Sequence, residues 1–134
     1  MSLYVRLRVA REEYAMPVEH VLEVADLGQV RVVPGSQPEL IGVWSLRSQI
    51  LPVVDLASLL QIPRTVQPSR LLVAEAGHRR AGFAIDDVSG VGLLGESMQE
   101  TESGLLIGAV LEGNGLIGVI DVPRVFDSLE QARQ

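Results

Sequence analysis

One structural unit occurs twice in this chain, about 66 positions apart. Residues 50–60 read as a strand, an aspartate and a short helix, and residues 116–126 repeat this pattern with Asp121 in the place of Asp55. An earlier pair of segments, 4–24 and 70–91, also matches, because each reads as strand, charged turn, strand and spaced valines. A repeat of this length is too long for a solenoid unit and suits two small barrels in tandem.

The hydrophobic pattern predicts an all-β chain. Residues 3–10 alternate apolar and polar side chains, as a half-buried strand does. Aromatic residues make up only 4% of the chain, so valine, leucine and isoleucine must fill the interior, and these residues fit pleated sheets. Residues 18–24 fit a helical turn that runs into a strand, but periodicity alone does not decide this. Helices are expected after Asp55, which would cap the first one, and at 122–134.

A hairpin is expected at Glu112-Gly113-Asn114-Gly115, because Asn-Gly supplies the positive φ of a type I′ turn. The same glycines, with Gly118, fit the G-x-G-x-x-G dinucleotide fingerprint. That fingerprint needs a helix to begin within it, whereas a strand follows here. We therefore interpret the segment as a turn.

Bulk properties exclude several classes of function. The net charge of −6 argues against binding to nucleic acid and to anionic lipid surfaces. Cysteine is absent, which leaves no disulfide framework and no thiolate chemistry. The start of the chain lacks the pattern of a signal peptide, and the longest apolar run, 105–111, is too short to span a membrane. We expect a soluble, cytoplasmic protein without direct membrane contact.

Residues that often carry chemistry have simpler explanations here. Asp55 and Asp121 occupy equivalent places before helices, so capping explains both. Asp86 and Asp87 are neighbours on an expected strand and would point to opposite faces. The chain's two histidines, His20 and His78, have no partner at metal-ligand spacing, and no serine lies in a nucleophile elbow. We predict no enzyme activity, no cofactor and no metal.

Trp44 and Arg47 are the candidate contact residues. Trp44 fits either the core or an interface, since tryptophan is highly buried on average but is also enriched, with arginine, in binding hot spots. Arg47 is expected at the tip of a hairpin, as the one charge in an apolar region. Its nearest plausible ion-pair partner is Glu23, on the strand after the spaced valines.

The stretch Gly42-Val43-x-x-Leu46-Arg47-x-x-Ile50-Leu51-Pro52-Val53-Val54-Asp55-Leu56 resembles the signature of the CheW-like domain family. Supporting matches are Glu13-Tyr14, Pro34 and residues 82–91, and the resemblance runs from about Leu3 to Phe126. It implies two five-stranded, SH3-like barrels that share a hydrophobic core. The expected organisation is one CheW-like domain over 1–134, with a first barrel at about 14–62 and a second at about 70–121. The N-terminal strand and the C-terminal helix would pack across both barrels.

The family's members are cytoplasmic adaptors that couple chemoreceptors to the CheA histidine kinase in chemotaxis, a two-component signal transduction system. The resemblance therefore implies two partners, the methyl-accepting receptor's cytoplasmic tip and the kinase's regulatory domain, in arrays at the inner face of the membrane. The positions matching the family's receptor site are Val21, Glu23, Gly42, Arg47, Gly82, Val88 and Val91. The candidate kinase contacts are Val43, Trp44 and Ile50.

The turn departs from the family pattern, since Ser45 and Ser48 stand where an asparagine and a glycine are usual. A serine at Ser48 would cost of order 1 kcal/mol if φ stays positive. The departure leaves open a scaffold of a non-flagellar chemosensory system that controls pili or surface motility. A third hypothesis, a small-barrel ligand or nucleic-acid binder, predicts basic or aromatic side chains on one barrel face, and the composition opposes it.

Overall fold

The computed structural model describes residues 2–28, 30–32, 39–64, 66–95, 97–113 and 115–131. Within these residues the chain forms strands and little helix, which confirms the all-β class. Pro34, which supports the family resemblance, lies outside them. The elements in chain order are β1 (Tyr4–Val9), β2 (Glu12–Pro17), the 3-10 turn η1 (Val18–His20), β3 (Val21–Asp26), β4 (Arg31–Val32), β5 (Leu40–Leu46), β6 (Gln49–Asp55), α1 (Leu56–Leu59), β7 (Arg70–Ala76), β8 (Arg79–Ile85), β9 (Asp87–Gly92), β10 (Met98–Gln99), β11 (Leu106–Glu112), β12 (Gly115–Ile120) and α2 (Val122–Gln131).

The described strands form two sheets with the same plan. Sheet A has the order β10-β11-β12-β2-β1-β9, and sheet B has the order β4-β5-β6-β8-β7-β3. Each sheet holds five longer strands and one edge strand of two residues, β10 or β4. The repeated segments of the sequence thus become repeated positions in two sheets.

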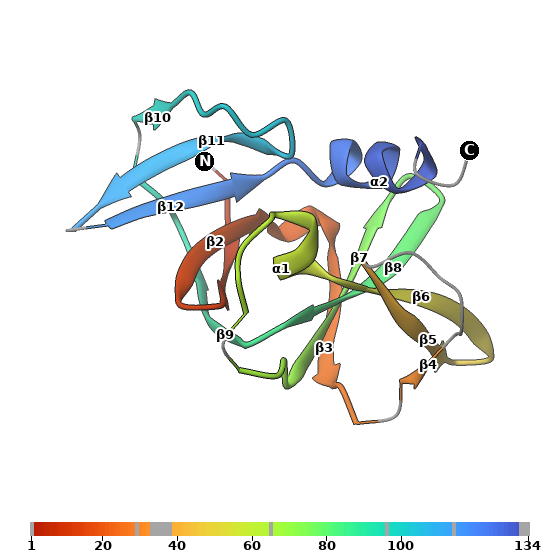
Figure 1. Ribbon diagram of the computed structural model, residues 1–134. Coiled ribbons are helices and arrows are strands. Elements are labelled where there is room, and N and C mark those ends of the chain that lie inside the picture. Colours follow the sequence, from red (N-terminus) through yellow and green to blue (C-terminus); the bar gives the residue numbers. More distant parts are fainter. Residues whose placement is uncertain are drawn as a thin grey trace.

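Each sheet takes its central hairpin from the other half of the chain. The β7–β8 hairpin lies between β3 and β6, and the β1–β2 hairpin lies between β9 and β12 (Figure 1). The parallel pair of β6 with β8 joins the β7–β8 hairpin to sheet B, and the parallel pair of β12 with β2 joins the β1–β2 hairpin to sheet A. Sheet membership therefore differs from the expected barrels at 14–62 and 70–121, which followed the halves of the sequence. A repeat shows which segments are alike, but it does not show which copies pair.

A large hydrophobic cluster joins the two sheets. It combines Leu7 of β1 with Leu72 and Phe83 of sheet B and with Phe126 of α2. The rings of Phe83 and Phe126 pack edge to face, with centroids 6.0 Å apart. A second, smaller cluster lies within sheet B and is built on Leu51, Val53, Leu71 and Val73. The larger cluster is the expected shared core, and it places α2 against sheet B.

The two aspartates cap their helices as expected. The Asp55 carboxylate accepts hydrogen bonds from the Ala57 backbone N–H at 3.2 Å and from the Ser58 hydroxyl at 3.0 Å. The Asp121 carboxylate accepts the Arg124 backbone N–H at 3.2 Å. Both carboxylates thus satisfy N–H groups that the first helical turn leaves free, which is the capping role predicted from their equivalent positions.

Hairpin turns of two residues connect the long strands. Glu112 pairs with Gly115, so the central residues of the β11–β12 turn are Gly113 and Asn114 and not the Asn-Gly pair that the sequence suggested. Gly113 has a φ of +61°, and Asn114 lies outside the described residues. The hairpin is confirmed, whereas its register is shifted by one residue from the expected one. Glycine at the first central position explains the shift, because it accepts positive φ without steric cost.

Candidate functional site

The β5–β6 hairpin presents Arg47 at a strained turn. Leu46 pairs with Gln49, so Arg47 and Ser48 are the central residues, with φ values of +49° and +71°. Positive φ at both positions is the signature of a type I′ turn, which glycine and asparagine favour. The side chain of Arg47 is exposed. Ser48 therefore adopts the positive φ that is expected to cost a serine of order 1 kcal/mol.

The expected ion pair between Arg47 and Glu23 is wrong. Among the described residues, no ion pair or side-chain hydrogen bond involves either of these two side chains. The reason is the order of sheet B, in which β8 and β7 separate the β5–β6 hairpin from Glu23 on the edge strand β3. Arg47 thus remains available to a carboxylate from another molecule.

Three of the expected receptor positions share one row across sheet B. Glu23 pairs with Val73, Val73 with Gly82, Gly82 with Val53, and Val53 with Gly42. Residues paired across neighbouring strands point to the same face of a sheet. Because Val53 and Val73 are completely buried in the smaller cluster, this face lines the interior of sheet B. Glu23 ends the row at the open edge of β3.

The two glycines of this row have a packing role. Gly42 and Gly82 are both buried. A Cβ atom on Gly82 would lie 2.6 Å from Cδ1 of Leu71, which is itself fully buried. Glycine at Gly82 therefore lets the Leu71 side chain fill the space between the strands. These two positions shape the sheet that carries the candidate site, and their burial keeps them from offering contact surface of their own.

Two of the three valines of the expected receptor site, Val21 and Val88, lie where the sheets meet. Val21 begins β3, an edge of sheet B, while Val88 and Val91 lie on β9, an edge of sheet A. Val21 and Val88 are both partly buried against the shared core. Val91 is 61% exposed, which is unusual for a valine in a strand. Valines from two different sheets thus border one core, as a seam between two barrels requires.

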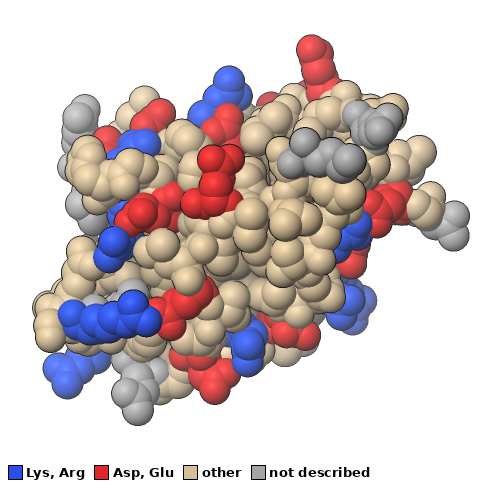
Figure 2. Space-filling model, turned by 180° about the vertical axis from the view of Figure 1, so that it is seen from behind, with Lys and Arg blue, Asp and Glu red and all other residues tan. Residues whose placement is uncertain are grey.

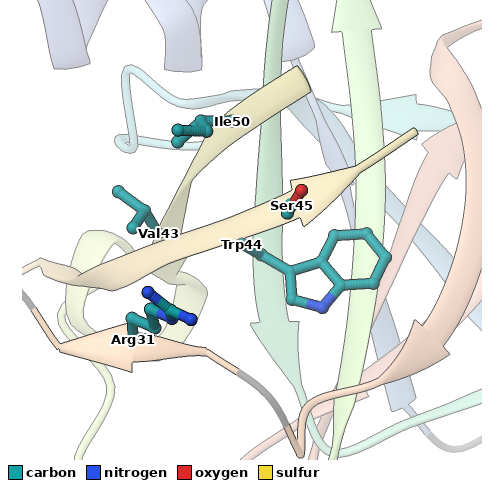
Figure 3. A pocket seen from close by; sticks show the side chains of 5 residues that line it. All are labelled: Arg31, Val43, Trp44, Ser45 and Ile50. Carbon is teal, nitrogen blue, oxygen red and sulfur yellow. The ribbon is translucent and has the colours of Figure 1, made fainter. Parts of the chain in front are cut away.

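The expected kinase contacts line an open groove of about 400 Å³ with Arg31 and Ser45. Figure 3 shows Val43 and Ile50 on one side of the β5–β6 hairpin and the Trp44 ring on the other. Ile50 is 72% exposed, whereas Trp44 is partly buried and packs against the smaller cluster of sheet B. The apolar contact surface is therefore formed by Val43 and Ile50, and Trp44 supports the strand from behind.

Sequence reasoning missed two arginines. Arg31 lines the groove, since it lies on β4 and pairs with Val43. Arg64 forms ion pairs with Asp55 and, at 3.0 Å, with Asp86, whose other oxygen accepts the Ala10 N–H at 3.0 Å. This second network links sheet B to the tip of the β1–β2 hairpin. The only signal for Arg31 was a single arginine between apolar residues, and nothing in the sequence indicated that Arg64 lies close to Asp55 and Asp86.

The described residues hold no group of three or more histidine or acidic side chains able to bind a metal. No helix formed by them is long and apolar enough to cross a membrane. Figure 2 shows acidic and basic side chains interspersed over one face, with uncharged surface between them. Interspersed charges of both signs suit contacts with proteins better than contacts with a phosphate backbone.

Comparison with known proteins identifies relatives that match most of the chain. The CheW-like domain family model matches residues 3–130. The chain is 26% identical over 126 residues to the chemotaxis protein CheW of Bacillus subtilis, covering 87% of this chain and 81% of that protein. It is 32% identical over 84 residues to the chemotaxis protein CheW of Thermotoga maritima, covering 62% of this chain and 56% of that protein.

A solved structure has the same fold. The crystal structure of the scaffolding protein TtCheW from Thermoanaerobacter tengcongensis superposes with a TM-score of 0.82 at 23% sequence identity, covering 90% of this chain and 84% of that one. At this identity the likeness concerns the fold alone. It confirms the prediction of two SH3-like barrels around a shared core.

Proposed function

Because the chain belongs to the CheW-like domain family, we propose that it is a non-enzymatic adaptor that couples chemoreceptor tips to a CheA-type histidine kinase. The names of its relatives, chemotaxis protein CheW and scaffolding protein, support the general role. The observation that carries the proposal is the β5–β6 hairpin. It exposes Arg47, which has no ion-pair partner among the described residues, at its tip and the apolar Ile50 on its face. A scaffold needs two such surfaces and no reactive group.

The receptor surface consists of the Arg47 tip and the seam between the sheets. Glu23 and the exposed Val91 would give it one acidic and one apolar contact, and the partly buried Val21 and Val88 would border the seam. Gly42 and Gly82 contribute by letting sheet B pack closely. An apolar centre with charges at its rim is the usual anatomy of a protein interface, and it suits a receptor's helical tip.

The kinase surface is the outer side of the same hairpin. Val43 and Ile50 provide its apolar contacts, and the half-buried Trp44 holds β5 in place behind them. A CheA-type regulatory domain has a related barrel fold, so that barrel would pack against barrel here. The adaptor would then work in the cytoplasm, recruited to receptor arrays at the inner face of the membrane through its partners.

One observation favours a variant of this role. The strained turn keeps Ser48 at a φ of +71° where the family usually has glycine. Because the serine at Ser48 lies next to Arg47, it would affect receptor specificity more than the fold. The chain would then serve a non-flagellar chemosensory system, such as one that controls pili or surface motility.

Arg47→Glu tests the proposal. The variant should fold normally, because Arg47 is exposed and forms no ion pair within the described chain, and it should lose affinity for the receptor tip by about tenfold or more. The measurement is surface-immobilised binding of cytoplasmic tip fragments from receptors of the same genome, with the melting temperature as a check on folding.

The matched control is Arg11→Glu, since Arg11 is also an exposed arginine at a hairpin turn and has a φ of +78°. This control should bind as the wild type does. Equal losses in both variants, or unfolding of Arg47→Glu, would contradict the proposed receptor surface. Failure of the wild type to bind any CheA-type regulatory domain of that genome would contradict the adaptor function itself.

A further inference from the structure

The groove beside Ile50 contains a cation that the proposed kinase contacts do not include. Arg31 pairs with Val43 across β4 and β5, and Ser45 pairs with Ile50 across β5 and β6. Val43 and Ser45 are two residues apart on one strand, so all four side chains share one face of the sheet. The guanidinium of Arg31 thus lies beside the apolar pair Val43 and Ile50 (Figure 3).

Arg31 differs from most arginines of this chain in having no carboxylate partner among the described residues. Six arginines form ion pairs, namely Arg6, Arg64, Arg70, Arg79, Arg80 and Arg124. The chain has 17 acidic residues for 11 basic ones, so carboxylates are not scarce. None of the described residues that line the groove is acidic. The groove therefore combines apolar surface with an unneutralised positive charge.

We infer that Arg31 determines the partner specificity of this groove by receiving a carboxylate of the kinase regulatory domain. This inference rests on the proposed function and adds the chemistry of its partner: an apolar side chain seats between Val43 and Ile50, and an Asp or Glu next to it reaches Arg31. Guanidinium binds carboxylate in a fixed, bidentate geometry, so the pair would set the register of the two barrels as well as add affinity.

Charge complementarity favours an acidic partner over a second copy of this chain. Two copies related by a two-fold axis would use the same patch on both sides, so the interface would hold two Arg31 cations and no carboxylate from the groove residues to pair with them. Like charges at the centre of an interface oppose association. A partner with a carboxylate beside an apolar side chain avoids this repulsion.

The experiment measures binding of the purified regulatory domain of the CheA-type kinase from the same genome to three variants of the full chain. Arg31→Gln should weaken binding by about tenfold and should flatten its dependence on salt concentration. Arg8→Gln, which removes the same charge from an exposed arginine without an ion pair on β1, should bind as the wild type does. Ile50→Asp should abolish binding, because it places a charge in the apolar centre.

The pattern of results separates this inference from the proposed function. If Ile50→Asp loses binding while Arg31→Gln matches the wild type, the kinase surface stands and the role of Arg31 is overturned. If the wild type does not bind, or if Ile50→Asp binds normally, the proposed kinase surface fails and the inference fails with it. If a concentration-dependent dimer of this chain forms and Ile50→Asp dissociates it, the groove belongs to a second copy.

A charge-neutralising scan of the regulatory domain completes the test. One Asp→Asn or Glu→Gln substitution there should cost the same factor in affinity as Arg31→Gln. The two substitutions together should cost no more than either alone, because they remove the same contact. If every such pair of substitutions is simply additive, Arg31 has no carboxylate partner in the complex and the inference is wrong.

Discussion

The two sheets carry equivalent rows of five residues that agree at two positions and differ at three. The row across sheet B is Glu23, Val73, Gly82, Val53 and Gly42. The row across sheet A, strand for strand, is Gly90, Arg6, Ala15, Val119 and Gly108. Sheet B places the fully buried Val73 where sheet A places Arg6. One backbone plan thus supports an apolar interior in one sheet and an ion pair in the other.

The Arg6 side chain is neutralised inside its own sheet. It donates hydrogen bonds of 2.5 and 2.8 Å to Glu112 and one of 3.0 Å to the Leu93 carbonyl oxygen. Glu23, at the open end of the row in sheet B, has no such partner among the described residues. This fold therefore tolerates a charged side chain in the row when that side chain is paired internally. An unpaired charge at the edge remains free for a partner molecule.

The largest effect is expected from Val73→Arg, which introduces into sheet B the arginine that sheet A has at the equivalent position. The guanidinium would have to enter the close-packed smaller cluster, where the described residues bury no carboxylate and only Glu23, at the edge of the row, is near, so we expect a loss of about 3–5 kcal/mol of unfolding free energy. Urea denaturation measures it. The reverse change, Arg6→Val, should have a much smaller effect. Similar losses for both would show that the two interiors do not differ in polarity.

Gly82→Ala tests a second difference between the two rows, because the equivalent position in sheet A is already Ala15. The new methyl group would collide with the buried Leu71, so we expect a loss of about 1–3 kcal/mol in unfolding free energy. Gly92→Ala is the control, since a Cβ there would meet no atom within 4 Å. Equal denaturation midpoints for the two variants would refute the packing role of Gly82.

The hairpin turns give a smaller contrast. Gly113 supplies the positive φ in the β11–β12 turn, whereas Ser48 must adopt it in the β5–β6 turn. Ser48→Gly should therefore raise the unfolding free energy by about 0.5–1 kcal/mol, as judged by the thermal midpoint. Ser45→Gly, in the adjacent strand, should instead lower stability, because glycine weakens a strand. Stabilisation by both changes would mean that turn strain is not the cause.

The smallest expected effect concerns the pH dependence of the Arg6 pair. The hydrogen bonds from Arg6 hold the pKa of Glu112 below its ordinary value. Since the folded-state pKa is lowered, the pair stabilises the protein above the ordinary glutamate pKa of about 4.3, and this contribution is lost as pH falls through the folded-state pKa. Wild type and Glu112→Gln should differ in denaturation midpoint near pH 7 and converge in acid. A difference that does not change with pH would contradict this assignment.

The sequence was sufficient for features with a local cause. Asp55 and Asp121 predicted their helices because a cap acts on N–H groups two or three residues away. The φ of Ser48 followed from a two-residue turn for the same reason. The family signature added the two-barrel fold, which the repeat had suggested independently.

Features that depend on long-range pairing could not be predicted in this way. The sequence did not reveal which hairpin enters which sheet, and this order decides that Glu23 cannot reach Arg47. Arg31 escaped notice because its importance arises only when β4 brings it beside Val43. The family resemblance suggested the residues of the candidate sites. Only the structure shows that Gly42 and Gly82 are buried, whereas Arg47, Ile50 and Val91 are exposed.

The exchange of hairpins has a consequence for how the polypeptide can be divided. A fragment that ends near residue 62 would keep β3 and β6 but lack both strands that lie between them. Such a fragment could complete its sheet only with the complementary fragment, or by exchanging hairpins with a second copy of the same fragment. Severing the linker should therefore yield two mutually dependent pieces and not two autonomous modules, so a disturbance at one barrel reaches the other through shared β-structure.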